Sequence, residues 1–463
     1  MTLGGRGQDR DVNRAMYFLY SFIIRAVLIL LSPYFLLRGL LRGKNLRNLP
    51  ERLGLRFPAE LAGTGAEARG AIWLHAVSVG EVLAAVPLAR ALKERCPERR
   101  LIVSTTTETG QALAQERMKF ADAVFYFPLD LPGAMRRAFR AARPGLIVVM
   151  ETEIWPNFLR MARQAGAPVV HANGRISDAS LRGFLRWSPR GFRQRVFADA
   201  SLYLMQSAED ARRAIDLGAP PERVQVTGNL KYDCEAPEEN DLVRWLRSEV
   251  ERTGRGPLLV AGSVLAGEER PVLDALALVT ERWPGALLVL APRKPERFAE
   301  AAALIEQAGR AAVRRSALTL GNGTPAGALR HDGGRRSPVL LVDTIGELAS
   351  LYRLADAVFV GGSLVPSGGH NPLEPAAFGK APVFGPSMEA FREVASEFLR
   401  EGAALQVGSG AELGAAWISL LENDQRRTEM GARARAVVEH HRGATGATLN
   451  HLAALLSAQQ AVR

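Results

Sequence analysis

The stretch GGSLVPSGGHNPLEPAAFGKAPVFGP, residues 361–386, directly follows the apolar run AVFV at residues 357–360. An apolar run, a glycine cluster and then the helix start NPLE are typical of the turn between a buried parallel strand and the helix after it. Glycine lets backbone N–H groups approach a ligand closely, and a helix N-terminus adds unpaired donors and partial positive charge. We therefore expect this stretch to bind a phosphate at four glycines: Gly361, Gly362, Gly368 and Gly369.

Glu374 lies one turn into the expected helix, where its carboxylate can accept hydrogen bonds from two neighbouring sugar hydroxyls. A phosphate beside a sugar indicates a nucleotide, and in particular a nucleotide-activated sugar. However, Asn371 as N-cap, Pro372 at the first helical position and Glu374 at the third also make a capping-box-like start that requires no ligand. The local sequence leaves both interpretations open.

Short apolar runs that lack clean alternation recur along the chain, each followed by a segment of helical period. In the first half they lie at residues 71–77, 101–107, 123–127, 145–150, 167–172, 201–206 and 224–228. In the second half they lie at residues 257–262, 286–291, 339–343, 357–361, 381–384 and 403–407. The pattern predicts a doubly wound parallel sheet in each half, covered by helices such as 82–96 and 155–164.

The predicted fold class is α/β, with two doubly wound Rossmann-like domains facing a cleft, plus an N-terminal membrane helix. Two such domains are the architecture of GT-B glycosyltransferases and of sugar-nucleotide epimerases. The expected division is an N-terminal tail and membrane anchor at 1–43, an acceptor-binding domain at 44–233, a linker at 234–256, and a donor-binding domain with a C-terminal helical tail at 257–463. Residues 321–338 are expected to form a flexible surface loop.

The composition limits the kinds of partner. With 463 residues the chain is too long for one ordinary core, and its net charge of +11 favours a nucleic acid, a phospholipid surface or a phosphorylated substrate. Neither a zinc-finger spacing nor an aromatic RNA-binding signature accompanies the charge, so we expect no nucleic acid. Cys96 and Cys234 are far apart and form no CxxC, which favours a reducing compartment without disulfides.

An apolar segment at residues 16–41 is long enough to cross a bilayer and is followed by the basic cluster RGKNLR at 42–47. Arg25 and Pro33 make it less than ideal as a plain transmembrane helix, so crossing the bilayer and lying in its interface both remain open. The basic cluster predicts that the main body lies on the cytoplasmic side. A soluble packing helix is the alternative. We expect removal of residues 1–43 to leave both domains folded.

The motif HAVSVGE at residues 75–81 follows the first apolar run of the first half. Ligands of such sheets bind at the carboxyl ends of the strands, so Glu81, one turn into the next helix, is a candidate general base. Ser78 and Glu81 also satisfy the S-x-x-E capping box, which needs no catalysis. Because a helix N-terminus favours the ionised carboxylate, we expect Glu81 to be ready to accept a proton but to be a weak base.

Several sequence blocks together resemble the bacterial 3-deoxy-D-manno-octulosonic acid (Kdo) transferases of lipopolysaccharide synthesis. They are HAVSVGE (75–81), METEIWPN (150–157), NGRIS (173–177), GNLKYD (228–233), APRKPERF (291–298), DTIGEL (343–348) and the glycine-rich stretch at 361–386. The resemblance covers nearly the whole chain from the membrane segment onward, in order. NGRIS departs from the more usual NARIS, and the loop at 321–338 is longer than typical. Neither change touches a residue assigned to chemistry.

The resemblance implies an inverting glycosyltransferase that moves Kdo from CMP-Kdo to the lipid A precursor, lipid IVA, at the cytoplasmic face of the inner membrane. It makes Glu81 the base that takes the proton of the attacking hydroxyl, and it makes Glu151 and Lys231 stabilisers of the transition state. A carboxylate suits oxocarbenium character, and a lysine suits negative charge on a phosphate. By the same resemblance nine residues hold the donor: Pro292, Arg293, Ile345, Gly346, Glu347, Asn371, Pro372, Leu373 and Glu374.

We expect no metal and no cofactor besides the donor. The only D-x-D is at residues 9–11, before the membrane segment, and His440 and His441 are expected to be solvated. The expected partners are CMP-Kdo, the phosphorylated lipid A precursor and the inner-membrane surface. Three alternatives remain: a GT-B enzyme that uses a UDP-sugar, a sugar-nucleotide epimerase, and a membrane-tethered sugar-nucleotide-binding module without catalysis.

Overall fold

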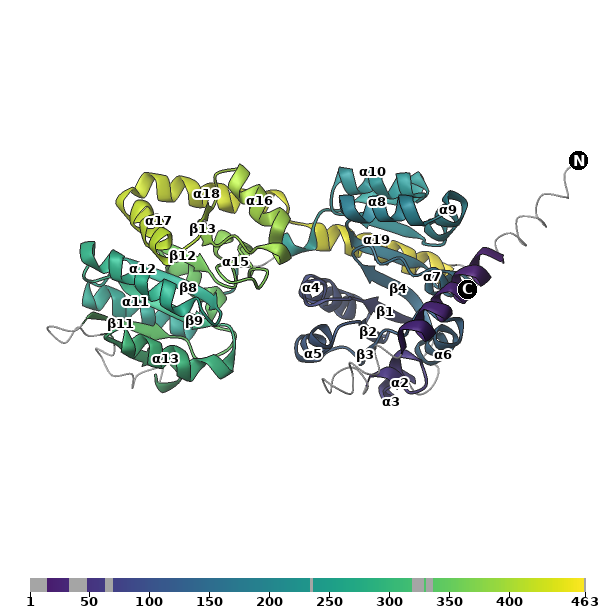
Figure 1. Ribbon diagram of the computed structural model, residues 1–463, viewed down its shortest axis with the longest axis horizontal. Helices are drawn as coiled ribbons and strands as arrows, with labels where there is room; N and C mark the ends of the chain where they lie inside the picture. The colour runs from purple at the N-terminus through teal and green to yellow at the C-terminus, as the bar shows by residue number, and fades with distance from the viewer. Residues whose placement is uncertain are drawn as a thin grey trace, which may run out of the picture. The chain divides into compact units, whose positions relative to one another are not determined.

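The computed structural model of the protein describes residues 15–32, 48–62, 70–233, 236–318, 329 and 336–461. The chain divides into two compact units, one formed by Met1–Asp233 with Arg442–Arg463 and the other by Cys234–His441. Each unit contains its own parallel sheet, as Figure 1 shows. The D-x-D at residues 9–11, Cys234, the basic cluster at 42–47 and most of the loop at 321–338 lie outside the described residues.

The sheet of the first unit has the strand order β3-β2-β1-β4-β5-β6-β7 within the described part of the chain. Its strands are β1 (Ala71–His75), β2 (Leu101–Thr105), β3 (Ala123–Tyr126), β4 (Pro144–Met150), β5 (Val169–Gly174), β6 (Leu202–Met205) and β7 (Val224–Val226). All neighbours are parallel. Each strand begins within two residues of an apolar run expected from the sequence, which confirms the predicted sheet.

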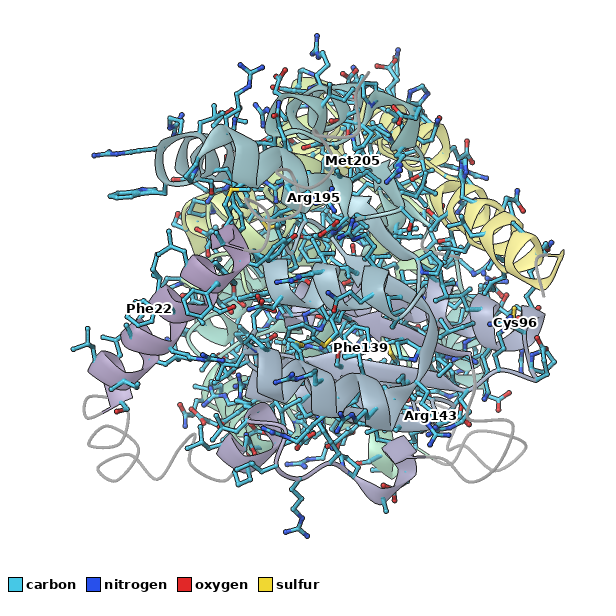
Figure 2. The ribbon with its side chains drawn as sticks, turned by 90° about the vertical axis from the view of Figure 1, so that its right-hand side faces the viewer. Phe22, Cys96, Phe139, Arg143, Arg195 and Met205 are labelled. Carbon is cyan, nitrogen blue, oxygen red and sulfur yellow. The ribbon has the colours of Figure 1, made fainter. Side chains whose placement is uncertain are left out.

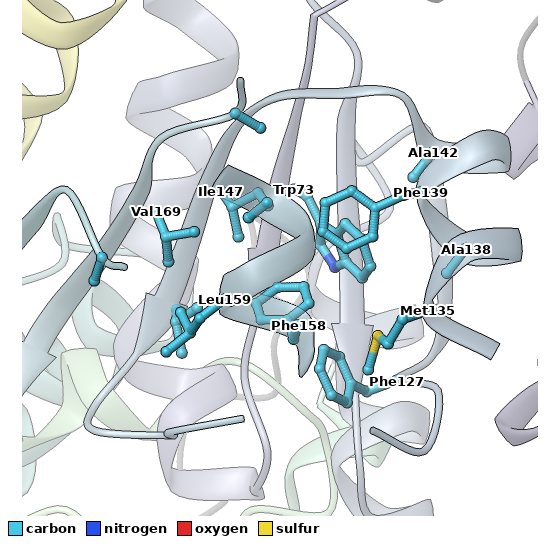
Figure 3. Close-up of a cluster of buried hydrophobic side chains, with 14 of the residues drawn as sticks. Trp73, Phe127, Met135, Ala138, Phe139, Ala142, Ile147, Phe158, Leu159 and Val169 are labelled. Atoms are coloured by element: carbon cyan, nitrogen blue, oxygen red, sulfur yellow. The ribbon is translucent and has the colours of Figure 1, made fainter. Parts of the chain in front are cut away.

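Both faces of this sheet are buried, which explains why its strands read as continuous apolar runs. Trp73 of β1 points into one core, where its ring lies 5.5 Å from that of Phe139 and 5.3 Å from that of Phe158 (Figure 3). The next residue, Leu74, is fully buried in a second core on the opposite face. Successive side chains of one strand therefore stabilise two different layers of helices.

The helices of the first unit form these two layers. Residues from α3 (Ala59–Ala62), α6 (Pro132–Ala142), α7 (Pro156–Gln164), α9 (Arg190–Ala198) and α10 (Ala208–Leu217) contribute to the core around Trp73. Residues from α4 (Val79–Arg95), α5 (Glu108–Arg117), the 3-10 turn η3 (Leu230–Tyr232) and α19 (Ala444–Ala461) contribute to the opposite core. The unit also contains α2 (Leu49–Arg52), α8 (Asp178–Trp187) and the 3-10 turn η2 (Pro221–Arg223).

The sheet of the second unit has the order β10-β11-β9-β8-β12-β13-β14 within the described residues. Its strands are β8 (Leu258–Val264), β9 (Leu287–Pro292), β10 (Arg310–Arg314), β11 (Arg336–Leu341), β12 (Ala357–Val360), β13 (Pro382–Phe384) and β14 (Leu405–Gln406). Its α-helices are α11 (Asp241–Thr253), α12 (Glu269–Arg282), α13 (Phe298–Gln307), α14 (Leu348–Leu351), α15 (Leu373–Ala376), α16 (Arg392–Arg400), α17 (Gly410–Glu422) and α18 (Asp424–His440). Only β10 is absent from the sequence prediction.

The domain boundaries differ from the expected ones at two places. Residues 241–253 of the expected linker form α11, which Asn240 caps and which buries Leu242, Val243 and Leu246. The C-terminal helix α19 belongs to the first unit and not to the expected donor domain, because Leu452 and Leu456 are buried beside residues of α4. The chain therefore returns to the first unit after building the second.

The N-terminal helix Ala15–Ser32 has a mean hydropathy of 2.0 over a window that is only 11% buried. Its first turns are nevertheless fixed to the first unit. The hydroxyl of Tyr17 donates to Asp199 at 2.5 Å, that of Tyr20 to Asp130 at 2.9 Å, and that of Ser21 to Asn157 at 3.1 Å. Tyr17 is 2% exposed and belongs to the core around Trp73. Removal of residues 1–43 would therefore take a buried side chain out of this core, which the expectation from the sequence did not include.

Candidate active site

The carboxyl edge of the first sheet carries the expected catalytic residues. The strand order reverses between the neighbours β1 and β4, because β2 and β3 continue on one side and β5 to β7 on the other. Open α/β sheets bind ligands outside the carboxyl ends of the strands at such a reversal. Glu81 follows β1 by one helical turn, and Glu151 directly follows β4. Both predicted residues therefore lie where the topology favours a ligand.

Glu81 lies in the first turn of α4 and is only 7% exposed. Its Oε2 accepts the N–H of Val77 at 2.8 Å, and its Oε1 accepts the hydroxyl of Ser78 at 2.9 Å. Ser78 Oγ in turn accepts the N–H of Glu81 at 3.5 Å, so the capping contact offered as the alternative is present. A carboxylate has roughly four acceptor positions, so these contacts leave Glu81 able to accept a proton as well.

Burial raises the pKa of Glu81 to about 7, and the nearby charge of Glu151 contributes to the rise. The hydrogen bonds from Val77 and Ser78 lower the pKa and are outweighed. The expectation of a weak base is therefore wrong, because loss of water disfavours the ionised form more than the helix N-terminus favours it. A carboxyl group with a pKa near 7 is well matched to accept a proton at neutral pH.

Glu151 adopts a backbone conformation that is unusual for its residue type, with φ at +55°. Its N–H donates to the carbonyl of Ala172 on β5 at 2.8 Å, which fixes the turn at the end of β4. Asn173, near the end of β5, has φ at +58°. Left-handed conformations of residues other than glycine cost about 1–3 kcal/mol and cluster at functional sites. Two such residues, at the ends of the neighbouring strands β4 and β5, mark this edge of the sheet as a candidate site.

Lys231 lies on η3, whose position Asn173 determines. Asn173 Oδ1 accepts the N–H of Leu230 at 2.9 Å, and Asn229 Oδ1 accepts the N–H of Lys231 at 3.0 Å. Leu230 is 2% exposed and packs in the core with residues of α4. The backbone of Lys231 is therefore fixed beside the end of β5 and against the helix of Glu81. Sequence reasoning missed Asn173 as the residue that holds η3, although it lies within the NGRIS motif.

The expected donor residues gather at the corresponding edge of the second sheet. Its strand order reverses between the neighbours β8 and β12. Pro292 ends β9, residues 345–347 follow β11, and residues 371–374 follow β12. Because β11, β9, β8 and β12 are adjacent and parallel, their carboxyl ends share one edge. The predicted donor residues therefore come together at this reversal.

The backbone N–H groups of the glycine-rich stretch after β12 have other hydrogen-bond partners than predicted. Glu268, which follows β8, is fully buried and accepts a backbone N–H from Leu265 at 2.9 Å. Its carboxylate also accepts N–H groups at 2.6, 2.9 and 2.9 Å from Gly362, Ser363 and Leu364. Gly362, which we expected to face a phosphate, therefore binds an internal carboxylate together with the two residues that follow it. Glu268 was missed because its partners lie far away in the sequence.

The other three glycines also use their N–H groups within the second unit. Gly361 donates to the carbonyl of Gly262 at 2.8 Å, Gly368 to Ser387 Oγ at 3.0 Å, and Gly369 to the carbonyl of Gly362 at 2.8 Å. The predicted phosphate site at four glycine N–H groups is therefore wrong. Gly362 has φ at +68°, and a Cβ there would lie 2.7 Å from the ring of His370, so the turn and its packing require glycine.

Among residues 345–347, two are exposed to solvent and one is hydrogen-bonded within the second unit. Ile345 is 56% exposed, and Gly346 is also exposed. The carboxylate of Glu347 instead accepts hydrogen bonds from Arg315 at 2.9 and 3.1 Å and one from the hydroxyl of Thr344. Glu347 thus stabilises the segment, and the parts that a nucleotide can reach are Ile345 and Gly346.

The NPLE segment leads into a short helix, α15 (Leu373–Ala376), whose N-cap is Pro372 and not the expected Asn371. Asn371 Oδ1 accepts the N–H of Leu373 at 3.1 Å, and its Nδ2 lies 3.5 Å from Glu374 Oε1. Burial raises the pKa of Tyr352, and the charge of Glu374 adds to this rise, so the carboxylate lies near that phenol. A four-residue helix contributes little dipole, which makes the side chains of Asn371 and Glu374 the main polar groups here.

Arg293 begins the turn after β9, where its N–H donates to the carbonyl of Val264 at 2.9 Å. Burial lowers the pKa of His370 to about 4, and the charge of Arg293 contributes. His370 is therefore neutral at pH 7, and the guanidinium of Arg293 lies close to the glycine-rich stretch. An arginine in this place suits a phosphate or carboxylate. Among the described residues, no group of three or more His, Cys, Asp or Glu side chains could hold a metal ion.

Comparison with known proteins identifies the class of enzyme and its fold. Residues 47–234 match a glycosyltransferase family model described as 3-deoxy-D-manno-octulosonic-acid transferase (kdotransferase). The crystal structure of Acinetobacter baumannii MurG is 14% identical, covers 82% of this chain and 98% of its own, and has a TM-score of 0.50. That likeness shows the fold alone, and it agrees with the predicted GT-B class.

Two relatives then define the family. The 3-deoxy-D-manno-octulosonic acid transferase of Haemophilus influenzae is 34% identical over 92% of this chain and 96% of the relative. That of Bordetella pertussis is 37% identical over 87% of this chain and 89% of the relative. The chain belongs to the Kdo transferase family and is a glycosyltransferase, as the sequence motifs predicted.

Proposed function

We propose that the protein transfers Kdo from CMP-Kdo to a hydroxyl of the lipid A precursor, lipid IVA, with inversion and without a metal ion. The main support is the acidic pair at the β1–β4 reversal, where Glu81 has a pKa near 7 beside Glu151. An inverting transfer needs a carboxylate that removes the acceptor proton during attack. Family membership supports the same assignment.

In this proposal Glu81 takes the proton of the attacking hydroxyl while the oxygen forms its bond to the anomeric carbon of Kdo. The bond from that carbon to the CMP phosphate breaks in the same step, and its electron pair leaves with CMP. Glu151 stabilises the positive charge that develops on the sugar. Lys231 and Arg293 neutralise negative charge on phosphate or carboxylate groups, which is why no metal is required.

The proposal places the protein at the cytoplasmic face of the inner membrane. Its N-terminal helix exposes Phe18, Phe22 and Ile29 to 71%, 60% and 71%. These positions, with Arg25, follow each other at helical spacing along one stripe. An apolar stripe that includes an arginine suits a helix lying in the membrane interface.

We expect CMP and CMP-Kdo to protect the purified protein from thermal unfolding, whereas UDP and UDP-sugars have little effect. A ligand that binds only the folded state raises its stability in proportion to RT ln(1 + [L]/Kd), so about 100-fold excess over Kd gives roughly 2.7 kcal/mol. Differential scanning fluorimetry with the four ligands provides the measurement. Stronger protection by a UDP-sugar would instead assign the donor to the UDP class.

Replacing Glu374 with alanine should weaken CMP binding by about 10- to 100-fold, since hydrogen bonds to a charged group contribute roughly 1.5–3 kcal/mol each. Isothermal titration calorimetry measures the change. Glu429→Ala, a substitution of an exposed glutamate on α18, is the matched control and should bind CMP normally. If Glu374→Ala also binds CMP normally, then Glu374 serves only its local contacts with Asn371 and Tyr352.

A further inference from the structure

A groove of about 520 Å³ lies in the first unit between the N-terminal helix, the segment after β4 and the helices α8 and α9. Met16, Leu19, Tyr20 and Ile23 line it from the N-terminal helix. The volume lies within the range of ligand sites, roughly 300–1,000 Å³. Its lining is mostly aromatic and aliphatic, so the matching ligand is a hydrocarbon chain and not a sugar or nucleotide.

The wall formed by the N-terminal helix stays in place because the helix is fixed by its other side. Tyr17 and Ser21 bond to Asp199 and Asn157 of the body, while Leu19 and Ile23 are 57% and 51% exposed. The outward side carries Phe22, which Figure 2 shows on the N-terminal helix. The N-terminal helix therefore has two apolar surfaces, one that lines the groove and one that faces the surroundings.

The opposite wall has the composition of a membrane-facing element. Phe184 and Trp187 of α8 line the groove, and Trp187 is 78% exposed. No residue of α8 is buried, and the guanidinium of its exposed Arg186 lies 5.2 Å from the centre of the Trp187 ring. Exposed tryptophan beside arginine is typical of segments at the level of lipid headgroups, where the cations attract anionic lipid.

The floor of the groove links it to the candidate active site. Ile154 and Trp155 line the groove and directly follow Glu153 in the chain, in the segment that begins with Glu151. Asp130 accepts the N–H groups of Asn157 and Phe158 at 3.0 and 2.8 Å, which fixes the start of the next helix. An occupant of the groove would thus lie beside the segment that carries the transition-state carboxylate.

We propose that this groove binds one acyl chain of the lipid acceptor and so positions the acceptor hydroxyl near Glu81. The proposal rests on the proposed function for the identity of the lipid, but the preference for a hydrocarbon chain follows from the groove itself. A groove between two elements that both expose apolar and aromatic side chains opens where a lipid chain can enter from a bilayer. Arg186 lies beside Trp187 of the groove lining, where it can pair with a phosphate of the same lipid.

Photo-crosslinking tests the occupant without any need for turnover. The probe is phosphatidylglycerol with a diazirine near the end of one myristoyl chain, mixed with the full-length protein in detergent micelles. We expect crosslinks to groove residues such as Leu19, Ile23 and Phe184. Crosslinks confined to the outward residues Phe18 and Phe22 would overturn the proposal. An absence of crosslinks to any groove residue would also overturn it.

A matched pair of substitutions tests the effect on transfer. Ile23→Trp fills the groove, whereas Ile215→Trp makes the same change at an exposed position on α10, outside the groove lining. Because a filled groove can no longer bury the methylene groups of the chain, we expect Ile23→Trp to raise the KM for the acylated acceptor at least about tenfold. The KM for a deacylated acceptor and for CMP-Kdo should stay unchanged, and Ile215→Trp should alter none of these values.

The outcomes separate the two proposals. If the wild-type protein transfers Kdo to neither acceptor, the proposed function fails, and the crosslinks still show whether the groove binds a chain. If Ile23→Trp raises the KM for both acceptors equally, or for neither, the groove does not recognise the acyl chain. The melting temperature of Ile23→Trp serves as the check on folding, and Ile23 is already half-exposed.

Discussion

Glu81→Gln should reduce Kdo transfer by about 100-fold or more, because the amide has no carboxylate to accept the proton of the acceptor hydroxyl. The affinity for CMP should remain close to that of the wild type, since every residue assigned to the donor belongs to the second unit. Single-turnover rates and calorimetric CMP binding measure the two quantities. Glutamine can still accept the N–H of Val77 with its amide oxygen and can donate its amide N–H to Ser78 Oγ, so the start of α4 should stay intact.

The pH dependence gives an independent check of the same role. The base must be ionised to act, and its pKa is about 7. Transfer by the wild type should therefore rise with pH through about 7 and then level off, and Glu81→Gln should lose this limb. Glu94→Gln, at an exposed position on the same helix, is the control and should keep both the rate and the limb. Near-normal turnover by Glu81→Gln would remove Glu81 from the mechanism.

The raised pKa of Glu81 shows what the sequence could not provide. The motif HAVSVGE predicts a glutamate in the first turn of a helix, and the helix position alone favours ionisation. The opposite shift arises from burial at the sheet edge and from Glu151, which is distant in the chain. A sequence pattern locates a residue in an element, but the surroundings that set its pKa depend on tertiary packing.

Burial explains why most strands could be predicted from the sequence and why one strand, β10, was missed. Strands buried on both faces appear as apolar runs, and Leu74 and Trp73 illustrate this by packing into different cores. β10 lies at the end of its sheet and has the sequence RAAVR, with an arginine at each end. An edge strand of this kind needs no continuous apolar run and therefore escapes a search for one.

The glycine-rich stretch lies where the sequence predicted, but its N–H groups do not face the external phosphate that we expected. Its position after β12, at the reversal of the second sheet, agrees with a donor site. Its N–H groups, however, bind the carboxylate of Glu268, which follows the neighbouring strand β8. The only signal in the sequence was a glutamate six residues after the apolar run at 257–262, which does not reveal a partner distant in the chain. The proposed donor binding therefore depends on side chains, chiefly those of Arg293, Asn371 and Glu374.

The N-terminal helix gives the second large expected effect. Phe22→Glu combined with Ile29→Glu should release most of the protein from vesicles, because both residues lie on the exposed stripe and outside the groove. Sedimentation with vesicles measures binding. The residual binding should fall as salt rises, since basic residues near an anionic surface contribute about 1 kcal/mol each. Transfer to a lipid in vesicles should drop far more than transfer to the same lipid in detergent, where tethering no longer supplies local concentration.

Tyr20→Phe distinguishes the two sides of this helix. It removes the hydroxyl that donates to the buried Asp130 and should cost about 1–3 kcal/mol of stability, while vesicle binding by the folded protein stays unchanged. The double glutamate variant should show the reverse, with normal thermal unfolding and weak vesicle binding. Deletion of residues 1–43 combines both effects, because it also removes the buried Tyr17, and so cannot test anchoring alone. Equal losses of transfer in vesicles and in detergent for the double variant would exclude an anchoring role for the exposed stripe.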